Sequence, residues 1–137
     1  MIGKMKKLLG KRCGFTLIEL LTVMMIAGTL AAIAIPSYKR SQIRARETVL
    51  AEDLYQMRRS IDAYYADYAT YPDSLQALVD GRYLRALPRD PFTQKDNTWK
   101  CVSPEYSDQG NLAGGSCFDV QSGSKKTGLN GLPYSAW

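Results

Sequence analysis

The stretch Gly14-Phe15-Thr16-Leu17-Ile18-Glu19-Leu20-Leu21 opens a long apolar segment and places a carboxylate near its start. From Phe15 to Ile35 the sequence FTLIELLTVMMIAGTLAAIAI contains 21 residues, and Glu19 is the only charged one among them. At 1.5 Å per residue, such a helix is roughly 31 Å long, about the thickness of the hydrocarbon core of a bilayer. The length therefore predicts a membrane-spanning helix over residues 15–36.

Glu19 is left unexplained by the two ordinary interpretations of this segment, and a third interpretation is given below. An ordinary signal anchor and a cleaved secretory signal both fit its length, and Ala32-Ile33-Ala34 matches the small-x-small pattern of a cleavage site. A carboxylate inside a membrane costs up to about 3 kcal/mol toward the bilayer centre and less near an end, so it usually has a partner. Neither of the first two interpretations supplies one.

The net charge of +5 is located in front of the apolar segment. Five basic residues precede Gly14, and removing them from the 18 Lys and Arg leaves 13, equal to the 13 Asp and Glu. The five are Lys4, Lys6, Lys7, Lys11 and Arg12. Four more basic residues follow the segment, namely Lys39, Arg40, Arg44 and Arg46. Five basic residues before the segment against four after it predict only weakly which end of the helix is cytoplasmic. The neutral remainder of the chain does not predict a nucleic-acid interface.

Two features of the composition bear on chemistry. The sequence contains no histidine, the commonest general base and a frequent metal ligand, and no other catalytic set converges, so an enzyme is not expected. Of the three cysteines, Cys13 lies in the basic leader, and Cys101 and Cys117 lie far downstream. If the leader is removed, the remaining two predict one disulfide in an oxidising compartment.

The basic leader, Gly14, Phe15 and the fixed offset to Glu19 together resemble the N-terminus of type IV pilins and pseudopilins. The resemblance implies that a prepilin peptidase cleaves between Gly14 and Phe15, and that the new Phe15 amine is N-methylated. It also implies that Glu19 pairs with the N-terminal amine of a neighbouring subunit when the helices bundle in a filament. Pro36 stands where these proteins have a helix-bending proline, and a proline inside a helix removes one backbone donor.

Beyond Pro36 the apolar residues follow a helical period. They recur at steps of seven, four, three and four, the stripe of an amphipathic helix. The stripe consists of Ile43, Leu50, Leu54, Met57, Ile61, Tyr64 or Tyr65, and Tyr68. No strong breaker interrupts the segment, so the membrane helix is expected to continue over residues 37–70, and residues 71–137 must cover the stripe.

A second block follows this helix. Asp73 or Ser74 is expected to cap a short helix that turns Leu75, Leu78 and Val79 inward and ends at Gly81. Together with Tyr71-Pro72, Tyr83-Leu84 and the turn Leu87-Pro88-Arg89-Asp90-Pro91-Phe92, this block resembles the major pseudopilins, the G subunits, of type II secretion systems. Strands are expected within 98–102 and 117–120, in a sheet of two or three short antiparallel strands. The expected fold class is α+β, and the resemblance implies the type IV pilin-like kind.

The segment Phe118-Asp119-Val120-Gln121-Ser122-Gly123 resembles the start of a calcium-binding loop in pseudopilins. Calcium takes six to eight oxygen ligands, several of them from carboxylates. No acidic residue follows Asp119, and Lys125 and Lys126 come soon after it. Asp119 is thus a weak candidate for a calcium ligand, and the disulfide is expected to stabilise this region instead.

The resemblance implies a structural role. The leader, residues 1–14, would be removed, and the chain would remain in the bacterial inner membrane with its head in the periplasm. The expected partners are copies of itself, other pseudopilins, prepilin peptidase and the inner-membrane assembly platform, with no nucleic acid. The assembled pseudopilus would drive protein export. The alternatives are a type IV pilus subunit for adhesion, motility or DNA uptake, and a periplasmic binding module on an ordinary anchor.

Overall fold

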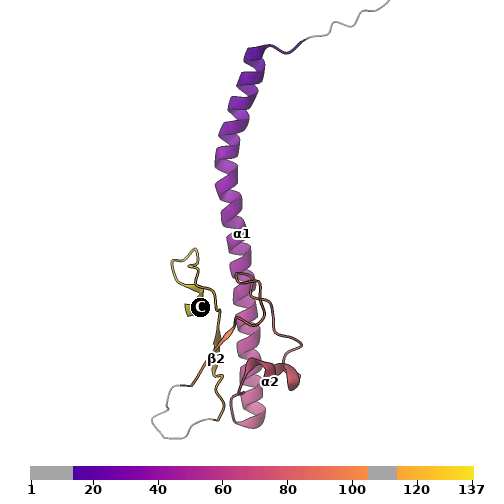
Figure 1. Ribbon diagram of the computed structural model, residues 1–137, viewed down its shortest axis with the longest axis vertical. Coiled ribbons are helices and arrows are strands. Elements are labelled where there is room, and N and C mark those ends of the chain that lie inside the picture. The colour runs from indigo at the N-terminus through magenta and orange to yellow at the C-terminus, as the bar shows by residue number, and fades with distance from the viewer. Residues whose placement is uncertain (1–13, 105–113) are drawn as a thin grey trace, which may run out of the picture. The chain divides into compact units, whose positions relative to one another are not determined.

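The computed structural model describes residues 14–104 and 114–137 (Figure 1). Its elements are α1 (Leu17–Tyr68), α2 (Leu75–Asp80), β1 (Lys100–Val102), β2 (Asp119–Gln121) and the 3-10 helix η1 (Tyr134–Ala136). The chain divides into two compact units, the first ending at Lys39 and the second, called the head below, comprising Arg40–Trp137. The predicted leader falls on residues 1–14, of which 1–13 lie outside the described residues.

Helix α1 contains 52 residues and includes Pro36. In the first unit its side chains are exposed all round, and none of its most apolar stretch is buried within the chain. By length and composition, α1 is the one helix among the described residues that could cross a membrane. The prediction of a single long helix is confirmed, with the end at Tyr68 and Ala69 at a φ of +55° just after it.

The head is built on the apolar stripe of α1. Four residues of the predicted stripe are at most 2 % exposed and form the core with apolar residues of the later segments. These four are Leu50, Leu54, Met57 and Ile61. The two ends of the stripe are uncovered, because Ile43 is 37 % and Tyr68 58 % exposed. The later segments therefore cover only the middle of the predicted stripe.

Helix α2 contributes Leu75 and Leu78 to this core, whereas Val79 is only partly buried. Ser74 occupies the N-cap position, as expected, but its side chain makes no capping hydrogen bond. Gly81 ends the helix, and its N–H donates to the carbonyl of Ala77. The short helix is thus held by its buried leucines more than by a side-chain cap.

The sheet has two antiparallel strands, and Cys101 of β1 lies opposite Val120 of β2. Both strands are shorter than expected and begin two residues later than the predicted ranges. The predicted disulfide between Cys101 and Cys117 is confirmed, with a Cα–Cα distance of 4.8 Å. Because Val120 and Cys117 are fully buried, the bridge ties β1 directly to the core.

Candidate functional site

The N-terminal motif is presented at the start of α1. Gly14, Phe15 and Thr16 precede the helix, and the Thr16 hydroxyl accepts a hydrogen bond from the Glu19 N–H at 3.3 Å. Thr16 therefore satisfies one of the free backbone donors of the first turn. The Gly14–Phe15 peptide bond is left in an exposed, non-helical segment, the form in which a peptidase can reach a bond.

In the part of the chain that the structure describes, nothing requires a glycine at position 14. A Cβ atom added there would meet no atom within 4 Å among the described residues. Since glycine costs conformational entropy where it is not needed, the residue is better explained by an outside protein that reads it. The cleavage itself stays a prediction.

Glu19 lies in the first turn of α1 and is exposed. A carboxylate there is favoured by the partial positive charge at the helix N-terminus, by about 0.3–1 kcal/mol in water. That local explanation accounts for an acid in the first turn of a soluble helix. It does not offset the cost of the same acid in an apolar environment, so the assembly role of Glu19 stays a prediction, as does the bend at Pro36.

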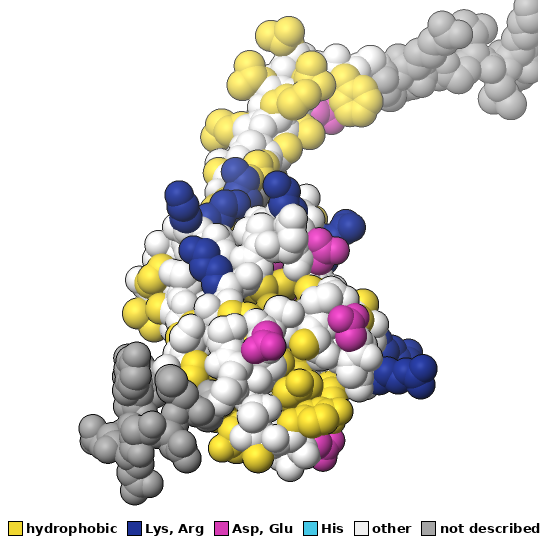
Figure 2. Space-filling model, turned by 60° about the horizontal axis from the view of Figure 1, so that its bottom comes forward, with side chains coloured by type: hydrophobic (Ala, Val, Ile, Leu, Met, Phe, Trp, Pro, Cys, Tyr) yellow, Lys and Arg dark blue, Asp and Glu magenta, His cyan; other side chains and the backbone are white. Residues whose placement is uncertain are grey.

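The apolar side chains of α1 from Leu17 onward, on both sides of Glu19 in the sequence, form an exposed hydrophobic surface on the first unit. Figure 2 shows yellow side chains along the part of α1 that precedes the head. They are more than half exposed, whereas soluble proteins rarely expose contiguous apolar patches of more than a few hundred Å². Among them are Leu17, Ile18, Leu21, Met25, Ile26, Leu30 and Ile33. Such a surface needs lipid or other helices around it.

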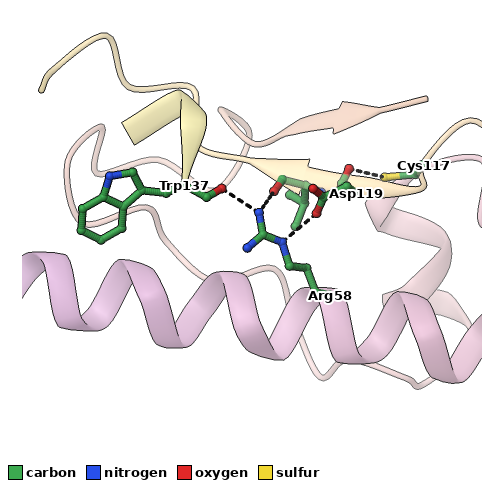
Figure 3. A network of polar contacts seen from close by, with 5 residues as sticks. Arg58, Cys117, Asp119 and Trp137 are labelled. Atoms are coloured by element: carbon green, nitrogen blue, oxygen red, sulfur yellow. Dashed lines mark hydrogen bonds and ion pairs between the residues drawn. The ribbon is translucent and has the colours of Figure 1, made fainter. Parts of the chain in front are cut away.

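Arg58 joins three segments of the head (Figure 3). Its Nε donates to Asp119 Oδ1 at 2.7 Å, and one terminal nitrogen donates to the carbonyls of Val120 and Trp137 at 3.2 and 2.6 Å. Both partners of the ion pair are about a third exposed, so solvent weakens their attraction. The guanidinium fork, which offers several donors in one plane, fixes β2 and the segment after η1 to α1.

The structure gives Asp119 a partner other than a metal. Its Oδ1 accepts hydrogen bonds from Arg58 and from the N–H of Val120, both at 2.7 Å. Among the described residues, no group of three or more His, Cys, Asp or Glu side chains could hold a metal ion. The 3.9 Å contact from Cys117 Sγ to the Asp119 carbonyl is not a hydrogen bond, because a disulfide sulfur has no hydrogen to donate.

Glu47 makes a second joint between α1 and the C-terminal segment. Its Oε1 accepts from the N–H of Leu129 at 2.7 Å and from the hydroxyl of Tyr134 at 3.0 Å. Burial of the Tyr134 ring, which is 1 % exposed, and the hydrogen bond to Glu47 raise the pKa of Tyr134 to about 12. The ring also stacks on Phe92 at a centroid distance of 3.9 Å, so η1 is anchored in the core.

Asp90, from the proline-bracketed turn, is fully buried and serves the fold. Its Oδ1 accepts from the N–H groups of Phe92 and Thr93, and its Oδ2 accepts from the hydroxyl of Ser122 at 2.5 Å. Partial burial and the nearby charge of Asp90 raise the pKa of Asp53 on α1. Asp90 therefore holds the turn against the strand region rather than offering a reactive group.

The sequence did not predict that Glu47 and Arg58 contact the rest of the head, because charged residues on a helix usually face solvent. A usable signal was present, because Glu47 lies three residues before Leu50 and seven before Leu54, on the stripe itself. Arg58 lies four residues after Leu54, at the edge of the stripe. Charged residues in those positions face the segments of the head that pack on the stripe.

Comparison with known proteins agrees with the motif and the fold. The prokaryotic N-terminal methylation motif matches residues 9–35. The type II secretion system core protein G of Vibrio cholerae serotype O1 is 30 % identical over 115 residues, covering 73 % of this chain and 76 % of the relative. The protein of the same name from Pseudomonas aeruginosa is 34 % identical over 111 residues, covering 69 % and 75 %. No solved structure matches the chain.

The long apolar helix that carries the methylation motif, with a short helix and a two-stranded antiparallel sheet, is the architecture of a type IV pilin-like protein. It is a class of membrane-anchored protein. Within this class, the chain belongs to the family of the type II secretion system core protein G, the pseudopilins.

Proposed function

We propose that this chain is a structural filament subunit of a type II secretion system, a pseudopilin that polymerises into a pseudopilus and drives protein export. The observation that carries the proposal is the exposed Gly14–Phe15 bond, followed by Glu19 in the first turn of α1. The most apolar stretch of α1 is not buried by any of the described residues. Lateral packing of several such helices would bury both the apolar side chains and the carboxylate. No catalytic step is assigned to any residue.

The first step of this function is processing by prepilin peptidase. Cleavage between Gly14 and Phe15 removes residues 1–14, and methylation of the Phe15 amine follows. The amine of one subunit then pairs with Glu19 of a neighbour in the filament core. In that low-dielectric environment a paired charge fixes the register of the helices, and an unpaired one is strongly disfavoured.

The proposed location is the bacterial inner membrane, with the head in the periplasm. Residues 15–36 span the membrane or form the filament core, residues 37–70 continue the helix outward, and residues 71–137 complete the head. The disulfide supports this orientation, because structural disulfides persist in oxidising compartments. The partners are copies of the chain, other pseudopilins, prepilin peptidase and the assembly platform.

Intact mass and N-terminal sequencing of the protein from membranes test the processing step. The expected mature protein begins with N-methylated Phe15 and retains the whole apolar segment. A Gly14→Val variant serves as control and should keep the leader, because the peptidase is proposed to read the glycine. A Cβ at position 14 would meet no atom within 4 Å among the described residues, so the variant should still fold. A mature chain that begins at Ile35 would instead establish a secretory signal and contradict the proposal.

A gene deletion separates secretion from the pilus alternative. Loss of exported proteins from the culture medium, with surface pili and twitching unchanged, is the expected result. Loss of surface pili with normal export would assign the subunit to a type IV pilus.

A further inference from the structure

The hairpin formed by residues 126–134 exposes two leucines at a hydrogen-bonded tip. Thr127 and Pro133 form an antiparallel bridge, and the Gly128 N–H donates to the carbonyl of Leu132 at 2.8 Å. Leu129 is nevertheless 46 % and Leu132 54 % exposed. Turn positions usually carry Gly, Asn, Asp, Ser or Pro, so neither leucine is explained by the turn.

Four basic residues belong to the two segments that the hairpin joins or contacts. Arg40 and Arg44 lie on the same face of α1 as Glu47, at helical spacings of four and three, and Glu47 contacts the hairpin at Leu129. Lys125 and Lys126 lead into the hairpin, and all four basic side chains are exposed. Figure 2 shows dark blue side chains gathered at the end of the head where α1 enters it. The last turn of α1, at the other end, carries no basic residue.

Chain connectivity keeps this end of the head near the membrane. Arg40 lies five positions after Ile35, the last residue of the apolar segment. Five residue steps reach at most about 18 Å even when the chain is fully extended. Along a straight, upright helix Glu47 would lie roughly 18 Å from the hydrocarbon edge, beyond a headgroup layer of about 5–8 Å. The tip therefore reaches the lipid only when the head leans toward the hairpin side.

Two general properties of membrane helices allow such a lean. Transmembrane helices tilt by about 20° on average and by up to about 40°. Pro36 has no N–H to donate to the preceding turn, which makes it a point where the helix bends at low cost. Leaning would bring basic groups to lipid phosphates and the two leucines to the boundary of the acyl chains, the arrangement of interfacial membrane-binding segments.

We propose that, before assembly, the head docks on the surface of its own membrane through this basic hairpin face, which binds anionic phospholipid headgroups and inserts Leu129 and Leu132. The proposal rests on the membrane anchoring of the proposed function but not on polymerisation. Docking would hold the head close to the bilayer until the subunit is withdrawn into a filament. Each basic residue strengthens the surface partition by roughly five-fold at moderate salt.

A spin label at position 132 tests this in the full-length chain. A Leu132→Cys variant that also carries Cys13→Ser is labelled and placed in nanodiscs holding one copy each, made of phosphatidylcholine alone or with phosphatidylglycerol. A matched label at Ala66, exposed near the other end of α1, is the control. We expect label 132 to gain access to membrane-dissolved oxygen and to lose access to an aqueous nickel complex only when phosphatidylglycerol is present, with label 66 unchanged.

Two perturbations should reverse the effect. Lys125→Gln with Lys126→Gln should lower the ratio of docked to undocked heads by about 25-fold, given roughly five-fold per residue. Salt at ~1 M, where the Debye length is about 3 Å, should do the same. An unchanged near-ultraviolet circular dichroism spectrum of the variant shows that its head is folded, and normal processing shows that its N-terminal segment is intact.

Three outcomes would overturn the proposal. A label that remains in water in both lipids means that the face does not bind membrane. A label that enters phosphatidylcholine equally well removes the role of the anionic headgroup. A label that is aqueous in single-copy nanodiscs but immobilised in vesicles with many copies identifies a second subunit as the true partner. Each of these leaves cleavage at Gly14 and export intact, so failure here is distinguishable from failure of the proposed function.

Discussion

A carboxylate costs little free energy in water but is strongly disfavoured without a partner in an apolar environment. Glu19 would meet this cost when its helix enters a membrane or a filament core. We expect Glu19→Gln, which keeps the size and removes the charge, to leave cleavage and membrane insertion intact and to abolish filament assembly. The physical reason is that the N-terminal amine of the neighbouring subunit would lose its partner inside the bundle. Filament yield after shearing, with immunoblots of the mature form, measures the effect.

Thr22→Ala is the matched control for this test, because Thr22 lies one turn further along and its hydroxyl bonds only to the carbonyl of Glu19 within the helix. Its filament yield should equal the wild type. Normal yield from Glu19→Gln would mean that this charge does not set the register.

Arg58 is the basic residue whose loss should cost the head most stability. Arg58→Met keeps the apolar stem but removes three hydrogen bonds to Asp119, Val120 and Trp137. We expect a loss of about 2 kcal/mol in the free energy of unfolding, because hydrogen bonds to charged groups contribute roughly 1.5–3 kcal/mol and the pair is partly solvated. Urea titration of the purified protein measures it.

Arg59→Met provides the comparison for Arg58, since Arg59 is its exposed neighbour on α1. It should change the free energy of unfolding by less than about 0.5 kcal/mol. Arg58→Lys should be intermediate, because an ammonium keeps the charge but lacks the planar fork. Equal effects at positions 58 and 59 would contradict the joint seen in Figure 3.

At the scale of elements, η1 is held to α1 by a group that titrates. The pKa of Tyr134 is raised to about 12 in the folded head, against about 10 in an unfolded chain. A pKa raised by folding means that its stabilising contribution is complete below pH 10 and is lost as the pH rises through 12. The head should therefore lose stability steeply between these values.

Tyr134→Phe should remove the part of this stability loss at high pH that is caused by ionisation of the Tyr134 hydroxyl, which donates to Glu47. At neutral pH the variant should be less stable by about 1 kcal/mol, the net value of one hydrogen bond. Above pH 10 its stability should fall less steeply than that of the wild type. Thermal unfolding followed by circular dichroism at several pH values tests this, and parallel pH profiles of the two proteins would rule out Tyr134 as the titrating group.

The elements differ in how far the sequence alone determined them. The extent of α1 and its buried residues Leu50, Leu54, Met57 and Ile61 followed from apolar length and helical period, which are local signals. The strands have only three residues each, too few for an alternating pattern to mark their ends. The capping signal at Ser74 located the start of α2 but not the missing side-chain bond.

The site residues divide along the same line. The motif at Gly14, Phe15 and Glu19 is contiguous, so the sequence displays it in full. Arg58 and Glu47 form hydrogen bonds with residues 61 to 87 positions away. A local sequence pattern cannot predict a partner at that distance. Their places on or beside the apolar stripe marked them as facing a cover, but the cover itself had to come from the fold.

For the whole molecule, the disulfide and a bound calcium ion make opposite predictions. The Cys101–Cys117 bridge closes a loop of about 17 residues and is worth roughly 3 kcal/mol in the chain-entropy model. In a head of roughly 100 residues that corresponds to more than 10 °C in melting temperature. We expect reduction to lower the melting temperature by about that much and a calcium chelator to leave it unchanged.

Cys101→Ser with Cys117→Ser should reproduce the effect of the reductant and make the protein insensitive to it. A melting temperature that falls with the chelator and ignores the reductant would restore the calcium loop, with Asp119 released from Arg58.

The Arg58 and Glu47 joints also set an order of events in time. α1 precedes in the sequence the segments that cover it, so the apolar stripe is synthesised, and on the proposed topology exported, before Asp119, Leu129 and Tyr134. Contacts that span so much sequence form late and slowly. A chain that stops before these residues would leave the apolar stripe exposed to proteases or chaperones. Only complete subunits, in which the head covers the stripe, would then be available for polymerisation.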